Sequence, residues 1–323
     1  MRRAGRFALA LVAGMATATM AQKPQGSPEV IQLAAPVTAV ALAASSNRAA
    51  VVSRDKKLTL WDLADGRLLR TMALGTAEID VMAISQDGRW IFTGEHSSNA
   101  FVWDANTGQA QIQLKLPHYP SAAAFSHDGK FIAIAPMGDP VQVYDVAAAR
   151  MLYQTNGVVG GTQAVAFSRD GTSMATADAD TAVRVYDARS GKQVAENRDF
   201  LLEPLAVDFN SDGRQVVAGG GDKIVAFIDA GSGKLIRRLQ KTDEPVSNYS
   251  LKVSPDGSLV AAILMKAENM TQPAPVVVWE VSSGQRKFEW MPTTLALDMD
   301  WTRDGRLISA GADADSLHIW RVP

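Results

Sequence analysis

The side chains best suited to chemistry are not arranged in a familiar catalytic or metal-binding pattern. The four histidines lack the spacing of metal ligands and lie at His96, His118, His127 and His318. The 323 residues contain no Gly-x-Ser-x-Gly elbow, His-Glu-x-x-His helix or phosphate-binding loop. The absence of cysteine excludes disulfides and thiolate metal sites. We therefore expect no catalytic residue, no cofactor and no bound metal.

Pairs of acidic residues are the nearest approach to acid-base chemistry. Two pairs lie in turn-like sequence, where Asp is favoured for bonding the backbone, at Asp178/Asp180 and Asp313/Asp315. A third pair, Asp298 and Asp300, could supply two neighbouring carboxylates, although the alternation of a β-strand alone would place both on one face. Turn and strand geometry is therefore the preferred interpretation of these pairs.

A repeat of about forty-two residues must position all of these groups. Its clearest mark is an Asp-Gly turn, which recurs at Asp87, Asp128, Asp170, Asp212, Asp256 and Asp304. An aromatic or apolar residue, usually followed by an acid, comes fifteen residues after the turn Gly at Trp103, Tyr144, Tyr186, Ile228 and Trp320, and twenty-two residues after it at Trp279. A degenerate first copy places Trp61-Asp62 downstream of Asn47. Because a unit this small cannot bury its own apolar faces, the repeats must pack against one another.

Each repeat contains four runs of β-compatible residues separated by tight turns. The fourth copy shows them as residues 163–168, 173–177, 182–186 and 192–195. Asp-Gly supplies the positive φ that a hairpin requires, and a Ser or Thr three residues before the Gly can bond the turn backbone. The sequence therefore predicts four short strands per repeat.

Four-stranded units in which Trp-Asp closes the third strand resemble the WD-repeat β-propeller family. The most specific residues are Trp61-Asp62, Trp103-Asp104 and the Ser-x-Asp-Gly turns at Ser85, Ser126, Ser168 and Ser254. The resemblance covers nearly the whole chain after the first segment. It implies an all-β fold, a seven-bladed propeller of four-stranded antiparallel blades.

The sequence departs from this family in its histidines. Members often place a Gly-His before the first strand, partnered with an Asp six residues before the Trp. Asp55, Asp180 and Asp222 occupy that Asp position, but no His precedes those blades. We expect the family's buried Asp-His network to be absent or replaced.

The two ends of the repeat region predict how the ring closes. Blade seven reaches Pro323 without a fourth strand, and residues 30–33 resemble fourth strands elsewhere, such as residues 111–114. We expect residues 30–33 to pair into blade seven, which would cover an otherwise exposed sheet edge.

The first 21 residues are typical of an export signal. Arg2, Arg3 and Arg6 precede an uncharged stretch, and small residues suit cleavage after Ala21. The stretch is shorter than the roughly twenty apolar residues that span a bilayer. We expect residues 1–21 to be a signal peptide, residues 22–323 to form the propeller, and the protein to be periplasmic. The alternative is an inner-membrane anchor formed by uncleaved residues 7–22.

The charge pattern excludes a nucleic-acid footprint. Residues 1–21 hold three Arg and no acid, so cleavage takes the net charge from −2 to −5, with 29 basic residues against 34 acidic. Lys and Arg are scattered and form no basic run. We expect a monomeric ring that binds no nucleic acid and has no membrane span once the signal is removed.

Departures from the repeat indicate where a partner could bind. The loop between the second and third strands of blade six, residues 265–275, is about seven residues longer than its counterparts. The family resemblance implies that this loop and the loops between blades open on the top face, where partners dock. The candidate partner-binding residues are Met265, Glu268, Met270, His118, Tyr119, Phe200, Trp290 and Met291. The alternatives are a tolerated insertion and side chains that fold inward to cap the blades.

A change of residue type occurs two positions before the turn Ser. This position holds Ala in blades one to four, at Ala41, Ala83, Ala124 and Ala166. Blades five to seven replace it with Asp208, Lys252 and Asp300, which should place Lys252 between two carboxylates near the inner edge of the ring. We expect a structural inter-blade ion pair, whose desolvation cost hydrogen bonds must offset. A ligand or ion site in the channel is the alternative.

The sequence therefore predicts a non-enzymatic, exported interaction scaffold that binds a protein or peptide through the top face. An envelope assembly factor is one alternative. Another is a propeller enzyme or quinoprotein-like subunit, because residues 187–192 and 229–234 look like repeats of quinone-cofactor propellers. Those repeats usually carry a Trp four residues after the Gly, a position held here by Ile112, Ala195, Arg237 and Phe288.

Overall fold

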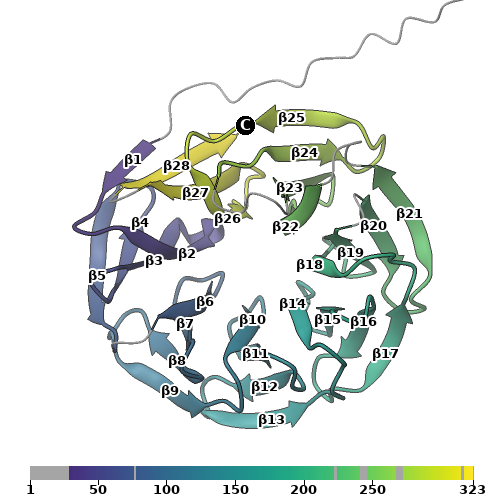
Figure 1. The fold of residues 1–323 in the computed structure, drawn as a ribbon, viewed down its shortest axis with the longest axis horizontal. Helices are drawn as coiled ribbons and strands as arrows, with labels where there is room; N and C mark the ends of the chain where they lie inside the picture. The colour runs from purple at the N-terminus through teal and green to yellow at the C-terminus, as the bar shows by residue number, and fades with distance from the viewer. Residues whose placement is uncertain are drawn as a thin grey trace, which may run out of the picture.

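The computed structural model describes residues 29–75, 78–221, 224–240, 246–266, 272–313 and 316–322. These residues form seven four-stranded antiparallel sheets arranged as the blades of a ring (Figure 1). One short 3-10 helix, η1 (Ala44–Ser46), follows the first strand of blade one. The prediction of an all-β, seven-bladed propeller with four strands per blade is confirmed.

In blades one to six the strands run in chain order from the channel outward, whereas in blade seven the N-terminal strand of the chain lies outermost (Figure 1). Blades one and two contain β2 (Val37–Ala43), β3 (Arg48–Ser53), β4 (Lys57–Asp62), β5 (Arg67–Ala73), β6 (Ile79–Ile84), β7 (Trp90–Glu95), β8 (Asn99–Asp104) and β9 (Ala110–Lys115). Blades three and four contain β10 (Pro120–Phe125), β11 (Phe131–Pro136), β12 (Gln142–Asp145), β13 (Arg150–Gln154), β14 (Thr162–Phe167), β15 (Ser173–Asp178), β16 (Val183–Asp187) and β17 (Gln193–Asn197). Blades five and six contain β18 (Pro204–Phe209), β19 (Gln215–Gly220), β20 (Ile224–Asp229), β21 (Leu235–Gln240), β22 (Val246–Val253), β23 (Leu259–Lys266), β24 (Val276–Glu280) and β25 (Arg286–Trp290). Blade seven contains β26 (Leu295–Trp301), β27 (Leu307–Asp313), β28 (Ser316–Val322) and β1 (Glu29–Gln32).

Blade seven joins the two ends of the described chain. Strand β1 pairs antiparallel with β28, with Glu29 opposite Ile319 and Gln32 opposite Ser316. The predicted closure is confirmed, and the closing strand begins one residue earlier than expected. Its side chain Ile31 is buried in a cluster shared with blade one. The closing strand therefore contributes to the core as well as covering an edge.

The Ser-x-Asp-Gly turns explain why the first two strands of a blade form a hairpin. In blade two the Ser85 hydroxyl donates to the Asp87 carboxylate at 2.5 Å and accepts from the Trp90 amide at 2.9 Å. Gly88 lies at φ +69°, the left-handed region that favours glycine. The same Ser contacts recur in blades three, four and six. Local turn chemistry thus fixes the hairpins before the blades meet.

The hydrophobic core lies between neighbouring blades. One cluster combines Trp90 and Phe92 of blade two with Ile132 and Tyr144 of blade three. Each blade therefore buries its apolar faces against its neighbours, as expected for a repeat that cannot form a core alone.

Successive antiparallel strands place the connections at two opposite ends of the ring. The hairpins between first and second strands lie at one end, which we call the hairpin end. The loops between second and third strands and from blade to blade lie at the other, which we call the loop face. The loop face corresponds to the top face of the sequence-based expectation.

Candidate functional site

Two exposed histidines lie on the loop face, each beside a carboxylate. His96 Nδ1 is 2.9 Å from the Asp80 carboxylate, and its ring stacks on Tyr119 with centroids 4.9 Å apart. His118 Nδ1 is 2.5 Å from the Asp139 carboxylate. Predicted residues His118 and Tyr119 are therefore part of a polar and aromatic group contributed by blades two and three.

The remaining predicted partner residues fall into different environments. Phe200 and Trp290 are buried in inter-blade clusters, so the inward-folding alternative describes these two side chains. Met291 is exposed beside Trp290. Three further candidates cannot be placed: Glu268, Met270 and the side chain of Met265 lie outside the described residues.

Among the described residues, four large apolar side chains stand exposed on the loops between blades. They are Val159, Leu201, Leu202 and Met291, which are 87%, 86%, 54% and 60% exposed. The other strongly exposed large apolar residues lie on outermost strands, at Val30, Leu68, Met151, Val194 and Ile236. The sequence-based selection included Met291 and the loop that contains Leu201 and Leu202 but missed Val159, whose signal was an apolar residue in a glycine-rich loop.

The innermost strands of blades five, six and seven are tied together by polar contacts. The Asp208 carboxylate accepts hydrogen bonds from the Phe209 amide and, across the blade junction, from the Val253 amide, both at 2.8 Å. Trp301 Nε1 donates to the Lys252 carbonyl at 3.1 Å. Both junctions of blade six are therefore bridged.

The junction between blades seven and one uses the carboxylate pair that the sequence placed on one face. Asp298 accepts from the Leu42 amide at 2.8 Å, and Asp300 accepts from the Ala44 amide at 2.9 Å. Asp300 also accepts from the Gln86 side-chain amide at 3.3 Å. The pair therefore binds the backbone of the neighbouring blade and is not arranged as an acid-base couple.

Lys252 does not make the direct ion pair that we expected. Among the described residues no carboxylate lies within 4.0 Å of its ammonium group, because Asp208 and Asp300 are directed towards backbone amides. Burial opposes the charge of Lys252, but Asp208, Asp300 and Asp298 more than offset this effect and raise its pKa. Burial also raises the pKa of Asp208, and it raises the pKa of Asp298 to about 6. The charges interact across the channel without direct contact.

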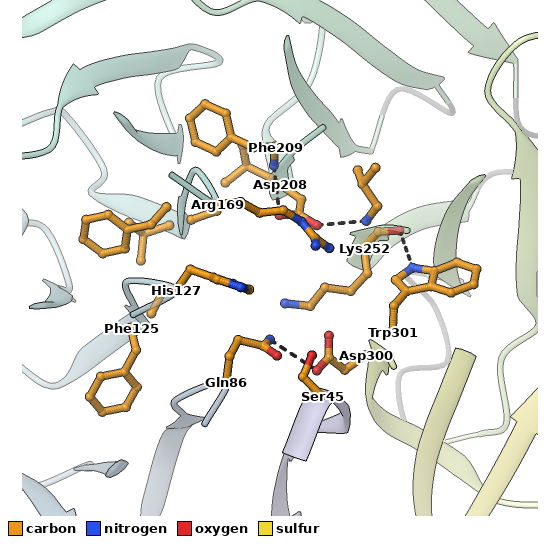
Figure 2. Close-up of a pocket in the computed structure, with 16 residues that line it drawn as sticks. Ser45, Gln86, Phe125, His127, Arg169, Asp208, Phe209, Lys252, Asp300 and Trp301 are labelled. Carbon is orange, nitrogen blue, oxygen red and sulfur yellow. Dashed lines mark hydrogen bonds between the residues drawn. The ribbon is translucent and has the colours of Figure 1, made fainter. Parts of the chain in front are cut away.

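A small cavity occupies the hairpin end of the channel (Figure 2). It has a volume of about 130 Å³, and its polar lining residues are Ser45, Gln86, His127, Arg169, Asp208, Lys252 and Asp300. The sequence identified only Asp208, Lys252 and Asp300, which replace Ala on the first strands of blades five to seven. Ser45, Gln86, His127 and Arg169 were missed because they occupy the second position of the turn, where the residue type varies from blade to blade. The signal was the repeat itself, because the same turn position in every blade lies at the same end of the channel.

Blade four contains a buried network in place of the Asp-His network of the family. Asp178 accepts hydrogen bonds from Thr162 at 2.6 Å, Thr176 at 2.9 Å and Arg184 at 2.7 Å. Arg184 also pairs with Asp180 at 2.6 Å, and hydrogen bonds from Arg184 are the main reason that the pKa of Asp180 falls to about 2. Asp178 therefore bonds side chains of three strands, where the sequence suggested backbone turn contacts.

No group of three or more His, Asp or Glu side chains comes together as a possible metal site within the part of the chain that the structure describes. In the same residues, no helix has the length and apolar character needed to cross a membrane.

The fold, the Trp-Asp strand ends and the Ser-x-Asp-Gly hairpins define the protein as a WD-repeat β-propeller. The family model described as the NWD2 C-terminal beta-propeller matches residues 29–242, and the chain belongs to this family.

Two curated relatives show the same class of repeat. The chain is 32% identical over 103 residues to the nuclear distribution protein PAC1 of Arthroderma benhamiae, a match covering 31% of this chain and 21% of that protein. It is 28% identical over 111 residues to the WD repeat-containing protein SL1-17 of Schistosoma mansoni, covering 34% of this chain and 37% of that protein. The matches thus span from about a fifth to just over a third of the length of these relatives.

Proposed function

We propose that this protein is a non-enzymatic scaffold that binds a protein or peptide partner through the loop face of its propeller. The observation that carries the proposal is the set of four exposed apolar side chains on the inter-blade loops, Val159, Leu201, Leu202 and Met291. Exposed apolar groups with polar surroundings are characteristic of protein interfaces. Membership of a WD-repeat propeller family supports a role in protein interaction.

The surroundings of Leu201 and Leu202 suggest the chemistry of the partner. Arg198, three residues earlier, pairs with Asp180 at 3.0 Å and with Glu196 on the same side of the ring. Such exposed ion pairs contribute little affinity alone but help to select the orientation of a partner. We therefore propose a partner that buries apolar side chains against the leucines and places polar groups over this charged rim.

The binding proposal is tested by crosslinked pull-down from the envelope fraction. Replacing both Leu201 and Leu202 by Ser should remove the main captured partner, because the apolar contact area is lost. The matched control replaces Leu68 and Ile236 by Ser, which are exposed apolar residues on outermost strands. Retention of the same partner by the loop variant and the control would contradict docking on the loop face.

A separate deletion variant tests whether the blade-six loop contacts the partner. Deletion of residues 266–275 should weaken capture if Met270 and Glu268 contact the partner. An identical partner set before and after the deletion would exclude this loop from the interface.

We also propose that the protein acts after export, in the periplasm. The support is the basic and then uncharged first segment with small residues before the predicted cleavage point after Ala21. Cell fractionation with N-terminal sequencing should find a soluble protein that begins at Gln22. A membrane-bound protein that retains residues 7–22 would instead support the anchored alternative.

A further inference from the structure

We propose that the hairpin end of the channel binds a small oxyanion that carries its own hydrogen-bond donor, such as hydrogen phosphate or an α-hydroxy carboxylate. The site is independent of the loop face, which lies at the opposite end of the ring. All seven blades contribute to it, because the turns of blades one to four and the innermost strands of blades five to seven converge there (Figure 2).

The cavity has room for a ligand of this size. Its volume is about 130 Å³. A cavity of about 150 Å³ accommodates benzene, so one of this size suits a ligand of about five or six heavy atoms. Gln86 and Lys252 line both this cavity and the wider channel beyond it. A larger substituent on the ligand would therefore extend into the channel.

The cationic groups of the cavity are available to a ligand. Figure 2 shows Lys252, Arg169 and His127 extending from different blades towards a common space. Within the described residues, neither the Lys252 ammonium nor the Arg169 guanidinium has an ion pair or a hydrogen-bond partner. Two unpaired cations directed at one cavity favour an anion there.

Three of the four oxygens of Asp208 and Asp300 are held by hydrogen bonds in the wall of the cavity. Both Asp208 oxygens accept hydrogen bonds from backbone amides. Asp300 accepts hydrogen bonds from the Ala44 amide and from the Gln86 side-chain amide. These hydrogen bonds hold both Asp208 oxygens and Asp300 Oδ2 at the wall, while the charge of the carboxylates helps to keep Lys252 protonated. The cavity therefore presents donors, although acidic residues line it.

Gln86 adds the requirement for a donor on the ligand. Its side-chain oxygen is buried and has no hydrogen-bond partner, while its amide nitrogen donates to Asp300. A buried acceptor left unpaired is costly, and a ligand hydroxyl would satisfy it. Hydrogen phosphate and lactate carry such a hydroxyl beside the oxyanion, whereas acetate does not.

His127 provides a spectroscopic signature of binding. Burial, together with the positive charges of Arg169 and Arg303, lowers the pKa of His127, while Asp300 and Asp128 act in the opposite direction. An anion bound beside the ring would favour the imidazolium form. Binding should therefore raise the pKa of His127, which NMR can follow after assignment of its signal with a His127→Asn variant.

The test is titration of the whole protein with phosphate, lactate and acetate, followed by calorimetry and by the His127 NMR signal. We expect saturable binding of phosphate or lactate, weaker binding of acetate, and a rise in the His127 pKa. Arg169→Gln should weaken binding by about tenfold or more, because it removes a charge-assisted hydrogen bond. Arg214→Gln is the matched control, since Arg214 is exposed on a neighbouring turn outside the cavity.

The affinity for phosphate relative to that for lactate shows which class of oxyanion the cavity prefers, because the two ligands differ in geometry. Arg169 has no partner among the described residues, so its replacement should leave the fold intact, and the thermal unfolding midpoint checks this. Absence of saturable binding by phosphate and lactate would overturn the proposal. Equal affinity in wild type and Arg169→Gln would overturn it as well.

Discussion

Individual charged residues in the channel serve the joints between blades. Asp208, Asp298 and Asp300 each accept a hydrogen bond from a backbone amide of the next blade, and Asp208 and Asp300 do so at the position that holds Ala in blades one to four. Hydrogen bonds to ionised groups are stronger than neutral ones, but burial of the carboxylate opposes its charge. The balance of these two effects should appear in the pH dependence of stability.

Asp298 gives a prediction with a definite sign. Burial raises its folded-state pKa from 3.8 to about 6, so the folded protein binds a proton more tightly than the unfolded chain. Stability from this group is fully present below the unfolded pKa and is lost as pH rises through about 6. Between pH 4 and pH 7 the free energy of unfolding of the wild type should fall relative to Asp298→Asn, by at most about 3 kcal/mol. Urea denaturation at several pH values measures this difference, and parallel pH profiles for the two proteins would contradict it.

At the scale of elements, the hairpins and the closing strand were predictable because their signals are local. The Asp-Gly turns bond within five residues of themselves, and strand β1 resembles other fourth strands in its own sequence. Contacts between blades were harder to predict from the sequence. The charge at Asp208 stood out from the repeat, but its partner, the Val253 amide, depends on the register of neighbouring strands.

Burial in the loops was also hard to predict. Phe200 and Leu201 are adjacent in one loop, yet Phe200 is buried and Leu201 is 86% exposed. Sequence alone selects the loop but not which side chain turns inward, because that depends on the space left by two packed blades. The network around Asp178 was missed for the same reason, since it joins Thr162, Thr176 and Arg184 from three strands.

The closing strand offers a prediction with a control in the same strand. Ile31 is buried, and Ile31→Ala should lower the free energy of unfolding by about 2–4 kcal/mol through lost burial and a cavity. Val30 is 51% exposed on the other side of β1, so Val30→Ala should have little effect. Chemical denaturation of both variants tests whether β1 is part of the cooperative ring. Equal, small effects at the two positions would contradict the closure.

The blade-four network predicts strong coupling between two residues. Arg184→Met leaves the Asp178 carboxylate buried without its cation and should cost about 3–5 kcal/mol. Adding Asp178→Asn removes the unpaired charge, so the double variant should be more stable than the sum of the single effects predicts. A double-mutant cycle measured by urea denaturation gives the coupling energy. Additive effects would mean that the network does not act as a unit.

At the scale of the whole molecule, the ring separates two kinds of surface. The loop face carries exposed apolar side chains on its inter-blade loops, whereas the hairpin end of the channel carries a polar cavity. Because the blades pack side by side around a closed ring, both surfaces rest on the same rigid strands. The central claim is that a protein partner binds the loop face.

Site-specific photo-crosslinking in cells tests this claim most directly. A photo-reactive amino acid placed at Leu201 lies on the loop face, one at Ile236 lies on an outermost strand, and one at Arg214 lies at the hairpin end. We predict a discrete crosslinked adduct from position 201 and little or none from positions 236 and 214. An adduct that forms equally at all three positions, or only at 236 or 214, would contradict binding through the loop face.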